Sequence, residues 1–445
     1  MRRSKAWFLL ILFGALVFTG CNKRKNPAGS SAPARGKVFE VDLNFVGTLD
    51  SVNNSLWVSN IRPRLIQSTR TVRVYTPPGY AQRGQGRPFP TLYLLHDFGG
   101  TDTYYGFYEL AETLDRMIAF GEIQPMLVVQ TDAINFYGGA FYTNSPGSAR
   151  YFTMIDSQLV GYVNDTYNTV FGKKSRGVCG HGMGGYGALK MILTGNDTTF
   201  GSVSALSAPL AFEGSATDQG FLSPSYRFAV FNELGVPLND STAYDSLRRE
   251  SFTDILSLFK PDPFNPKLVR TNLLFAMAAA FSSVDTTLDG NTDSLSTSQQ
   301  NSTPYFFKFS QTGRDAGVLF PFNYKGDLIL SVWSRWLRHD IKTFLADPAK
   351  LARLDSVPLY ISCGLDDQLG MLEQNKTFRD TLTSKGFSPV SSFAGMTRTQ
   401  FSKKFFYEEY PGYPGRPADH NTFINDQLVK VLKFHSQFLD TAQVP

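Results

Sequence analysis

The chain has 445 residues, of which 42% are hydrophobic and 18% charged, a balance that supplies a sizeable core and excludes intrinsic disorder. Its formal net charge is +5, but seven basic residues and no acidic residue lie within residues 1–35, so the rest of the chain carries −2. The basic character belongs to a short tail, and we therefore expect no nucleic-acid partner for the folded body.

The first twenty residues have the features of a bacterial export signal. Basic residues precede an apolar run, Ala6 to Phe18, which is too short to span a bilayer comfortably as a helix. The run ends in Phe18-Thr19-Gly20-Cys21, which resembles the lipobox of bacterial lipoproteins. We expect a signal peptide at residues 1–20, lipidation at Cys21, and a membrane anchor in the cell envelope, periplasm-facing or at the outer membrane. An ordinary cleaved signal and an uncleaved anchor are the alternatives.

The body of the chain alternates short apolar runs with helix-like segments. Residues 21–36 are polar and rich in Pro, Ala, Gly and Ser, and they predict a flexible tether before this body. Because the runs are apolar throughout, they predict parallel strands buried on both faces. The expected fold class is α/β, with a mostly parallel, doubly wound sheet, helices on both faces, and the site at the strands' carboxyl ends. The predicted strands are Val72–Tyr75, Thr91–Leu95, Met126–Val129, Gly177–Cys179, Val203–Leu206 and Leu359–Cys363.

The segment of about residues 210–356 interrupts this alternation. It contains helix-like stretches at Thr271–Phe281 and Leu328–Phe344, and a polar run at Asp285–Thr303 that predicts a mobile loop. We therefore expect one domain at residues 37–445 with a cap-like insertion.

Three side chains that could carry chemistry are interpreted as parts of the core. His435 lies on an apolar stripe at helical spacing, Ile424 to Leu439, and we expect a packed histidine. Cys179 and Cys363 end two strands that another strand would separate, so their sulfur atoms would be too far apart for a disulfide. Both are expected to be buried free thiols.

The stretch Arg176–Leu189 has the glycine spacing of a nucleophile elbow. In that motif, G-x-S-x-G, a serine stands at the tip of a strained strand-to-helix turn. Here the tip is Gly182, between Gly180 and Gly184. Glycine adopts the required conformation without strain, but it brings no attacking atom. The sequence therefore predicts the turn without its nucleophile.

A serine-type site also needs a histidine base and an acid that orients it, which follow the nucleophile in the order acid, then histidine. His420, in the loop before the final helix, is the candidate base by elimination among five histidines; a surface-loop histidine is the alternative. Asp367 follows a predicted strand and is the candidate acid, with Asp366 as the runner-up. An aspartate that caps the following helix is the other interpretation.

Backbone N–H groups of Met183 and Phe98 are the candidate oxyanion donors. Asp97 places a carboxylate beside this hole, where a negative charge would oppose the oxyanion unless it points to solvent. His181 precedes the tip and is expected to point away from the cleft. Ser145, from a loop near the cleft, has no evident base.

These segments together resemble the putative-esterase family of α/β-hydrolases, a group similar to esterase D (S-formylglutathione hydrolase), feruloyl esterases and the antigen 85 mycolyltransferases. The resemblance covers roughly residues 60–440 and implies the α/β-hydrolase fold. The segments that carry it are Arg73–Tyr80, Leu92–Gly100 with His-Asp where the family usually has His-Gly, Gly138–Ser145, the elbow, and Cys363–Gly370.

The resemblance aligns Gly182 with the family's nucleophilic serine, Asp367 with its acid and His420 with its histidine. It implies an ester substrate class, and we expect no cofactor and no metal. The segment before His420, Pro414–Asp419, departs from the family's usual Gly-His approach. The candidate residues of the ligand cleft are Asp97, Tyr142, Asn144, Ser145 and His181.

The sequence thus favours an esterase-like lipoprotein, impaired or inactive in serine-type hydrolysis, that binds an ester or acylated carbohydrate. One alternative is an active carboxylic ester hydrolase that uses His420 and Asp367 with water or an unconventional nucleophile. The other is an envelope scaffold that acts through the cap insertion. If only the nucleophile is missing, Gly182→Ser is expected to gain activity, with Asp97→Gly added if it does not.

Overall fold

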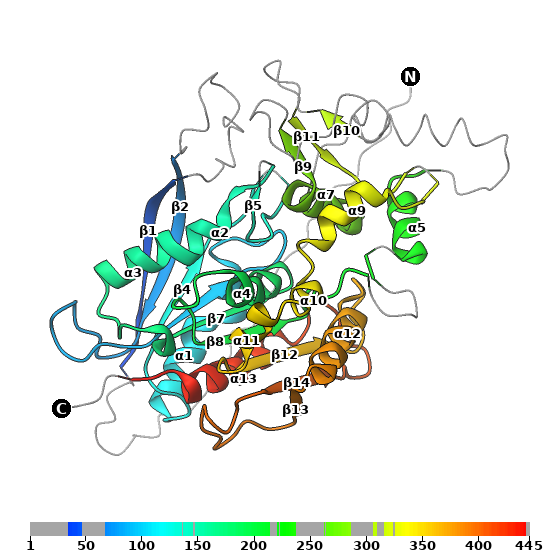
Figure 1. Ribbon diagram of the computed structural model, residues 1–445. Helices are drawn as coiled ribbons and strands as arrows, with labels where there is room; N and C mark the ends of the chain where they lie inside the picture. Colours follow the sequence, from blue (N-terminus) through cyan, green and yellow to red (C-terminus); the bar gives the residue numbers. More distant parts are fainter. Residues whose placement is uncertain are drawn as a thin grey trace, which may run out of the picture. The chain divides into compact units, whose positions relative to one another are not determined.

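In the computed structural model, a large sheet runs through the unit Ala34–Pro445 (Figure 1). Among the described residues, nine strands form it in the order β1-β2-β4-β3-β7-β8-β12-β14-β13. Neighbours from β4 to β13 are parallel, whereas β2 is antiparallel to both β1 and β4. The mostly parallel α/β sheet predicted from the sequence is therefore confirmed. The strands are β1 (Lys37–Val46), β2 (Gln67–Thr76), β3 (Thr91–Leu95), β4 (Leu127–Thr131), β7 (Arg176–His181), β8 (Ser202–Leu206), β12 (Leu359–Gly364), β13 (Ser388–Val390) and β14 (Lys404–Tyr410).

The described residues all belong to one compact unit, Ala34–Pro445. They are 34–46, 67–135, 137–145, 147–213, 220–221, 223–236, 262, 264–285, 306–308, 316–323 and 325–441. The predicted signal peptide, Cys21, most of the tether and residues 286–303 of the predicted loop lie outside these ranges. Within them, no helix is both long and apolar enough to cross a membrane.

The two faces of the sheet build two separate apolar cores. Along β3, Tyr93 and Leu95 belong to one core, and Leu92 and Leu94 belong to the other. This burial on both faces explains why the strand is apolar at every position. The first face is covered by α4 (Met183–Thr194) and α12 (Met371–Ser384), and the second by α1 (Leu110–Ala119) and α13 (Ile424–Phe438).

The side chains assigned to the core lie there. His435 is buried on α13, and its two ring nitrogens hydrogen-bond to the hydroxyls of Ser202 (2.8 Å) and Ser204 (2.9 Å) on β8. Cys179 and Cys363 are buried free thiols on β7 and β12, which β8 separates.

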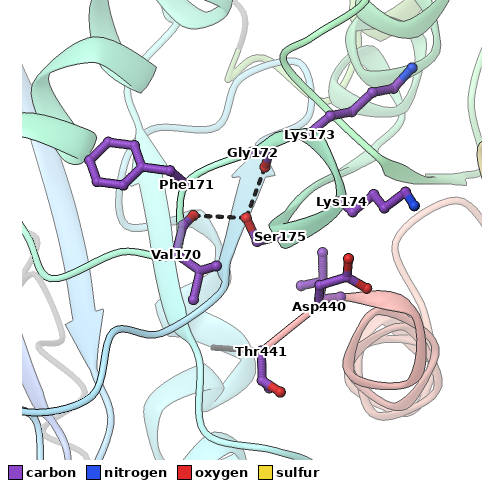
Figure 2. A pocket seen from close by; sticks show the side chains of 9 residues that line it. Val170, Phe171, Gly172, Lys173, Lys174, Ser175, Asp440 and Thr441 are labelled. Carbon is purple, nitrogen blue, oxygen red and sulfur yellow. Dashed lines mark hydrogen bonds between the residues drawn. The ribbon is translucent and has the colours of Figure 1, made fainter. Parts of the chain in front are cut away.

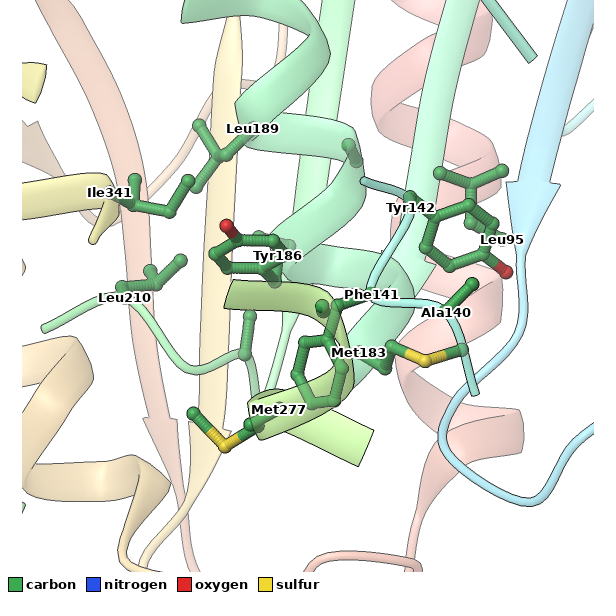
Figure 3. Close-up of a cluster of buried hydrophobic side chains, with 14 of the residues drawn as sticks. Leu95, Ala140, Phe141, Tyr142, Met183, Tyr186, Leu189, Leu210, Met277 and Ile341 are labelled. Atoms are coloured by element: carbon green, nitrogen blue, oxygen red, sulfur yellow. The ribbon is translucent and has the colours of Figure 1, made fainter. Parts of the chain in front are cut away.

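The segment predicted to be an insertion shares a core with the sheet. Its helix α7 (Val269–Phe281) is buried from Thr271 onward. Met277 of this helix lies in the same apolar cluster as Tyr186 of α4 and Phe141 (Figure 3). This cluster fixes the helix beside the elbow, because Tyr186 lies in the first turn of α4.

The helix predicted at Leu328–Phe344 is two helices, α9 (Leu330–Leu337) and α10 (Ile341–Phe344). The break arises because the Asp340 carboxylate accepts a hydrogen bond from the Lys342 N–H and caps the second helix. The other helices and strands are β5 (Asn144–Ser145), β6 (Ala149–Arg150), α2 (Tyr151–Thr153), a π-helix (Met154–Leu159), α3 (Val160–Thr166), α5 (Pro224–Glu233), β9 (Ser283–Asp285), β10 (Phe306–Lys308), β11 (Ala316–Leu319) and α11 (Pro348–Leu354), with short 3₁₀ helices at Tyr104–Tyr108 and Lys173–Ser175.

Candidate active site

The turn between β7 and α4 has the backbone of an elbow. Gly182 joins the two with φ 50° and ψ −115°, in the left-handed region that favours glycine. Its N–H donates to the Leu206 carbonyl (2.8 Å), and its carbonyl accepts from the Tyr186 N–H (3.1 Å). A Cβ on Gly180 would overlap the backbone of Gly184, and a Cβ on Gly184 would overlap the Leu95 carbonyl, so α4 approaches β7 and the end of β3 closely only because both residues are glycine. The sharp turn is therefore formed without a serine.

The carboxylate of Asp97 fills the space beside the tip. A Cβ built on Gly182 would overlap Oδ1 and Cγ of Asp97 and would lie 2.8 Å from Oδ2. The Met183 N–H, the candidate oxyanion donor, donates to Asp97 Oδ1 at 2.7 Å. Asp97 is only 7% exposed, so its carboxylate does not point to solvent. The first turn of α4 stabilises this negative charge through its free N–H groups.

His420 and Asp367 lie together beside this carboxylate. Nδ1 of His420 lies 2.7 Å from Asp367 Oδ2, and its Nε2 lies 3.0 Å from Asp97 Oδ2. Asp367 Oδ1 accepts the Leu369 N–H (3.0 Å), whereas the runner-up, Asp366, accepts the Ala418 N–H (2.8 Å) and holds the loop before His420. The imidazole therefore bridges two buried carboxylates.

The charges of Asp97, His420 and Asp367 stabilise one another. Burial alone would raise the pKa of Asp97, but its neighbours, His420 first, lower it to about 2. Burial alone would lower the pKa of His420, but Asp367 and Asp97 outweigh it and raise the pKa to about 10. At neutral pH, His420 is an imidazolium between two carboxylates and has no lone pair with which to act as a base.

His181 lies beside Asp97 and His420, in keeping with its place among the candidate cleft residues and contrary to the expectation that its ring points away from the cleft. Its Nε2–H donates to the His420 carbonyl (2.8 Å), and its Nδ1 lies 2.8 Å from the Tyr104 hydroxyl and 3.6 Å from Asp97 Oδ2. Burial, and then the charge on His420, lowers the pKa of His181 to about 4, so the ring is neutral. No sequence pattern singles out Tyr104, which reaches the site from the 3₁₀ helix that follows the His96–Gly100 loop.

Two hydrogen bonds to neighbouring segments and one hydrogen bond within the loop hold the His96–Gly100 loop. His96 Nε2 accepts the Ala133 N–H (2.7 Å), and its Nδ1 lies 2.7 Å from the Asp97 carbonyl. The Gly99 N–H donates to the Gly138 carbonyl (2.8 Å). Burial lowers the pKa of His96, which keeps the ring neutral for both contacts. The position of the Asp97 carboxylate is thus imposed by the fold.

The predicted cleft residues of the loop at 138–145 contact protein groups. Tyr142 is buried, and its hydroxyl donates to the His96 carbonyl (3.2 Å). Asn144 is exposed and donates to the Thr153 hydroxyl (2.8 Å), and the Ser145 hydroxyl donates to the Ala279 carbonyl (2.8 Å). These residues brace the loop against its neighbours. The role of Phe98 as a second oxyanion donor stays a prediction; its side chain is half-buried.

A cavity of about 870 Å³ lies away from this site (Figure 2). It is lined by Val170–Ser175 and Leu439–Thr441. Ser175 directly precedes β7, so the cavity is at the amino end of a strand whose carboxyl end, His181, lies at the candidate site. The Ser175 hydroxyl donates to the Val170 and Gly172 carbonyls, at 2.7 and 2.8 Å.

Residues 64–422 match the model of the protein family described as "Putative esterase". The chain belongs to this family. The resemblance inferred from the elbow, the His96–Gly100 loop and the Asp367 and His420 segments is therefore confirmed at the level of the family.

Two esterases of Mycobacterium tuberculosis, Esterase MT1326 and Esterase Rv1288, are each 29% identical to this esterase-family chain over 140 residues. The matched segment is 30% of this chain and 28% of the length of each relative. A ferulic acid esterase structure has a TM-score of 0.49 at 16% identity, with 91% of this chain and 98% of that chain covered. An S-formylglutathione hydrolase from Agrobacterium tumefaciens has a TM-score of 0.46 at 14% identity, with 93% and 99% covered.

Proposed function

We propose that this protein is an esterase-family member that has lost serine-type ester hydrolysis and binds an ester or acylated carbohydrate without efficient turnover. One observation carries the proposal. The Asp97 carboxylate stands where the side chain of residue 182 would begin, and it occupies both partners that a serine nucleophile would need, the Met183 N–H and His420 Nε2.

Each of these contacts opposes the chemistry of a serine esterase. The oxyanion donor already binds an anion, and a second anion beside Asp97 would be repelled. His420 is protonated and cannot accept a proton from an attacking hydroxyl or water. Removal of the nucleophile in a serine hydrolase costs on the order of a millionfold in turnover, and binding and the oxyanion hole leave roughly a thousandfold over water. Here the oxyanion hole is filled as well, so we expect activity near the uncatalysed rate.

The second candidate is a hydrolase in which Asp97 is the nucleophile. Its position between the oxyanion donor and the histidine favours this possibility. Oδ2 would attack the acyl carbon, the bond to the alkoxide would break, and the His420 proton would pass to the alkoxide. Water would then cleave the mixed anhydride and regenerate Asp97. An anhydride is less stable than the ester from which it forms, so we rank this candidate below the first.

The location proposed for the protein rests on its N-terminal motif. An apolar run followed by Thr19-Gly20-Cys21 supports export and a lipid anchor in the bacterial envelope. The ligand would then be an ester at or outside the membrane surface. Labelling with a radioactive fatty acid should mark the wild type and not Cys21→Ala.

The hydrolysis of p-nitrophenyl acetate and methyl ferulate by the wild type and Asp97→Asn tests the proposed function. We expect wild-type rates near the buffer background and saturable binding of methyl ferulate by calorimetry. Rapid hydrolysis by the wild type that Asp97→Asn abolishes would overturn the proposal in favour of the aspartate nucleophile. If the protein neither hydrolysed nor bound these esters, the proposal that it binds an ester would be wrong. The proposed loss of serine-type hydrolysis would remain.

A further inference from the structure

Three buried side chains converge at the carboxyl end of β7, and each points one polar atom toward the other two. They are Asp97, His181 and His420, and one ligand atom of each lies within 4.8 Å of the other two. Asp97 Oδ2 is 3.0 Å from His420 Nε2 and 3.6 Å from His181 Nδ1. The three come from separate segments: the loop after β3, the last residue of β7, and the loop before α13.

We propose that these three residues bind a divalent transition-metal ion, with Zn²⁺ as the best fit. Zinc bonds to histidine nitrogen and carboxylate oxygen are about 2.0–2.2 Å long, so two ligand atoms of a tetrahedral site are roughly 3.3–3.5 Å apart. The separations of 3.0 and 3.6 Å measured from Asp97 Oδ2 bracket this spacing. Two histidines and one carboxylate also form a typical three-ligand zinc set, in which a fourth position is open to water or substrate.

The hydrogen bonds behind the two imidazoles orient them as metal ligands. The His181 Nε2 faces the His420 carbonyl, which can only accept, so the proton is on Nε2 and the lone pair is on Nδ1. Nδ1 of His420 faces the Asp367 carboxylate at 2.7 Å, which directs Nε2 toward Asp97. Metal-binding histidines almost always have such a carbonyl or carboxylate partner on the other ring nitrogen. Both rings therefore already have the outer hydrogen bonds of a metal site.

The charge of the site suits a divalent cation. Asp97 would contact the ion directly, and Asp367 would act through His420. The ion would displace the proton on His420 Nε2. The two buried carboxylates, beside two neutral imidazoles, then carry two negative charges, which one divalent ion neutralises. The Tyr104 hydroxyl, 2.8 Å from His181 Nδ1, would give up this hydrogen bond when the metal binds. The inference does not depend on the proposed loss of serine chemistry, since it concerns binding of the ion alone.

Metal binding by the tag-free chain, after treatment with a chelator, tests the site. Calorimetry with Zn²⁺ should give one equivalent per chain, and Co²⁺ should give the intense visible bands of a four- or five-coordinate ion. Asp97→Asn and His181→Gln should each weaken Zn²⁺ binding by at least about 100-fold. His339→Gln, which removes a histidine that contacts Lys190 instead, is the matched control and should leave the stoichiometry and affinity unchanged.

Two results would overturn the metal site. One is a wild type that takes up no stoichiometric Zn²⁺ or Co²⁺; the other is uptake that Asp97→Asn and His181→Gln leave intact. If either variant fails to fold, as judged by circular dichroism, Tyr104→Phe replaces it, because the loss of a hydroxyl that competes for Nδ1 should tighten Zn²⁺ binding and alter the Co²⁺ bands. Unchanged affinity and bands in Tyr104→Phe would then place any bound metal elsewhere.

Discussion

Gly182→Ser should destabilise the protein and leave it inactive. The new Cβ would overlap Oδ1 and Cγ of Asp97, so the carboxylate would have to leave its place. It would lose the hydrogen bonds to the Met183 N–H (2.7 Å) and to His420 (3.0 Å). Hydrogen bonds to charged groups contribute about 1.5–3 kcal/mol each, and a non-glycine residue in this backbone conformation costs about 1–3 kcal/mol more. The total is roughly 4–9 kcal/mol, against a typical stability of about 5–15 kcal/mol.

The double variant Asp97→Gly with Gly182→Ser should behave differently. Without the carboxylate, the serine has room, and His420 Nε2 and the Met183 N–H are released for a hydroxyl and an oxyanion. We therefore expect the double variant to be more stable than Gly182→Ser by several kcal/mol and to be the one that gains esterase activity. The sequence analysis expected Gly182→Ser to gain activity, with Asp97→Gly added if it did not, and the overlap between the two side chains favours the double variant.

A double-mutant cycle measures this coupling. Urea denaturation of the wild type, both single variants and the double variant gives the interaction free energy, and hydrolysis of p-nitrophenyl acetate gives the activity. Asp97→Ala with Gly182→Ser is a control that also removes the clash. If Gly182→Ser alone were within about 1 kcal/mol of wild type and hydrolysed the ester, the steric and electrostatic reasoning would be refuted.

Two further predictions concern buried charges. Asp97→Asn should lower the free energy of unfolding by about 3 kcal/mol, because it removes one partner of a buried ion pair with His420, and an unchanged urea midpoint would contradict this. Burial lowers the pKa of Lys190 from 10.5 to about 7 in the fold, so between these values the unfolded chain binds more protons and Lys190 makes stability rise with pH. Lys190→Met should therefore raise the free energy of unfolding more at about pH 7 than at about pH 10. An equal stability difference at both pH values in urea denaturation would count against the buried, neutral lysine.

The parts of the fold that the sequence predicted are those decided by local pattern. β3 coincides with the predicted Thr91–Leu95 because every side chain in it is buried, and the elbow follows from glycine spacing that close packing requires. β14 (Lys404–Tyr410) was missed, since its burial is mixed and its charged residues weaken the apolar signal. One helix was predicted at Leu328–Phe344, where the structure has two, because the sequence analysis did not recognise Asp340 as the N-cap of the second helix.

The sequence allowed the residues of the site to be predicted better than the contacts between their side chains. Asp367 and His420 follow from chain order and position, and the structure brings their side chains to 2.7 Å. The place of the Asp97 carboxylate depends on how its loop is anchored to the Ala133 N–H and to Gly138, which no local pattern encodes. The direction of the His181 ring was missed for the same reason, since its partner is the carbonyl of a residue 239 positions later.

The overlap between position 97 and position 182 also constrains the history of this site. The resemblance described above implies that relatives of this chain have a serine at the elbow tip and a glycine after the histidine of the oxyanion loop. A chain with both the serine and Asp97 would suffer the steric clash, whereas a chain with glycine at both positions would not. The stepwise path of least strain is therefore loss of the hydroxyl first and arrival of the carboxylate second. With the carboxylate in place, a single change of Gly182 to serine would not restore the serine site that the resemblance implies, because Asp97 fills the space that the side chain needs.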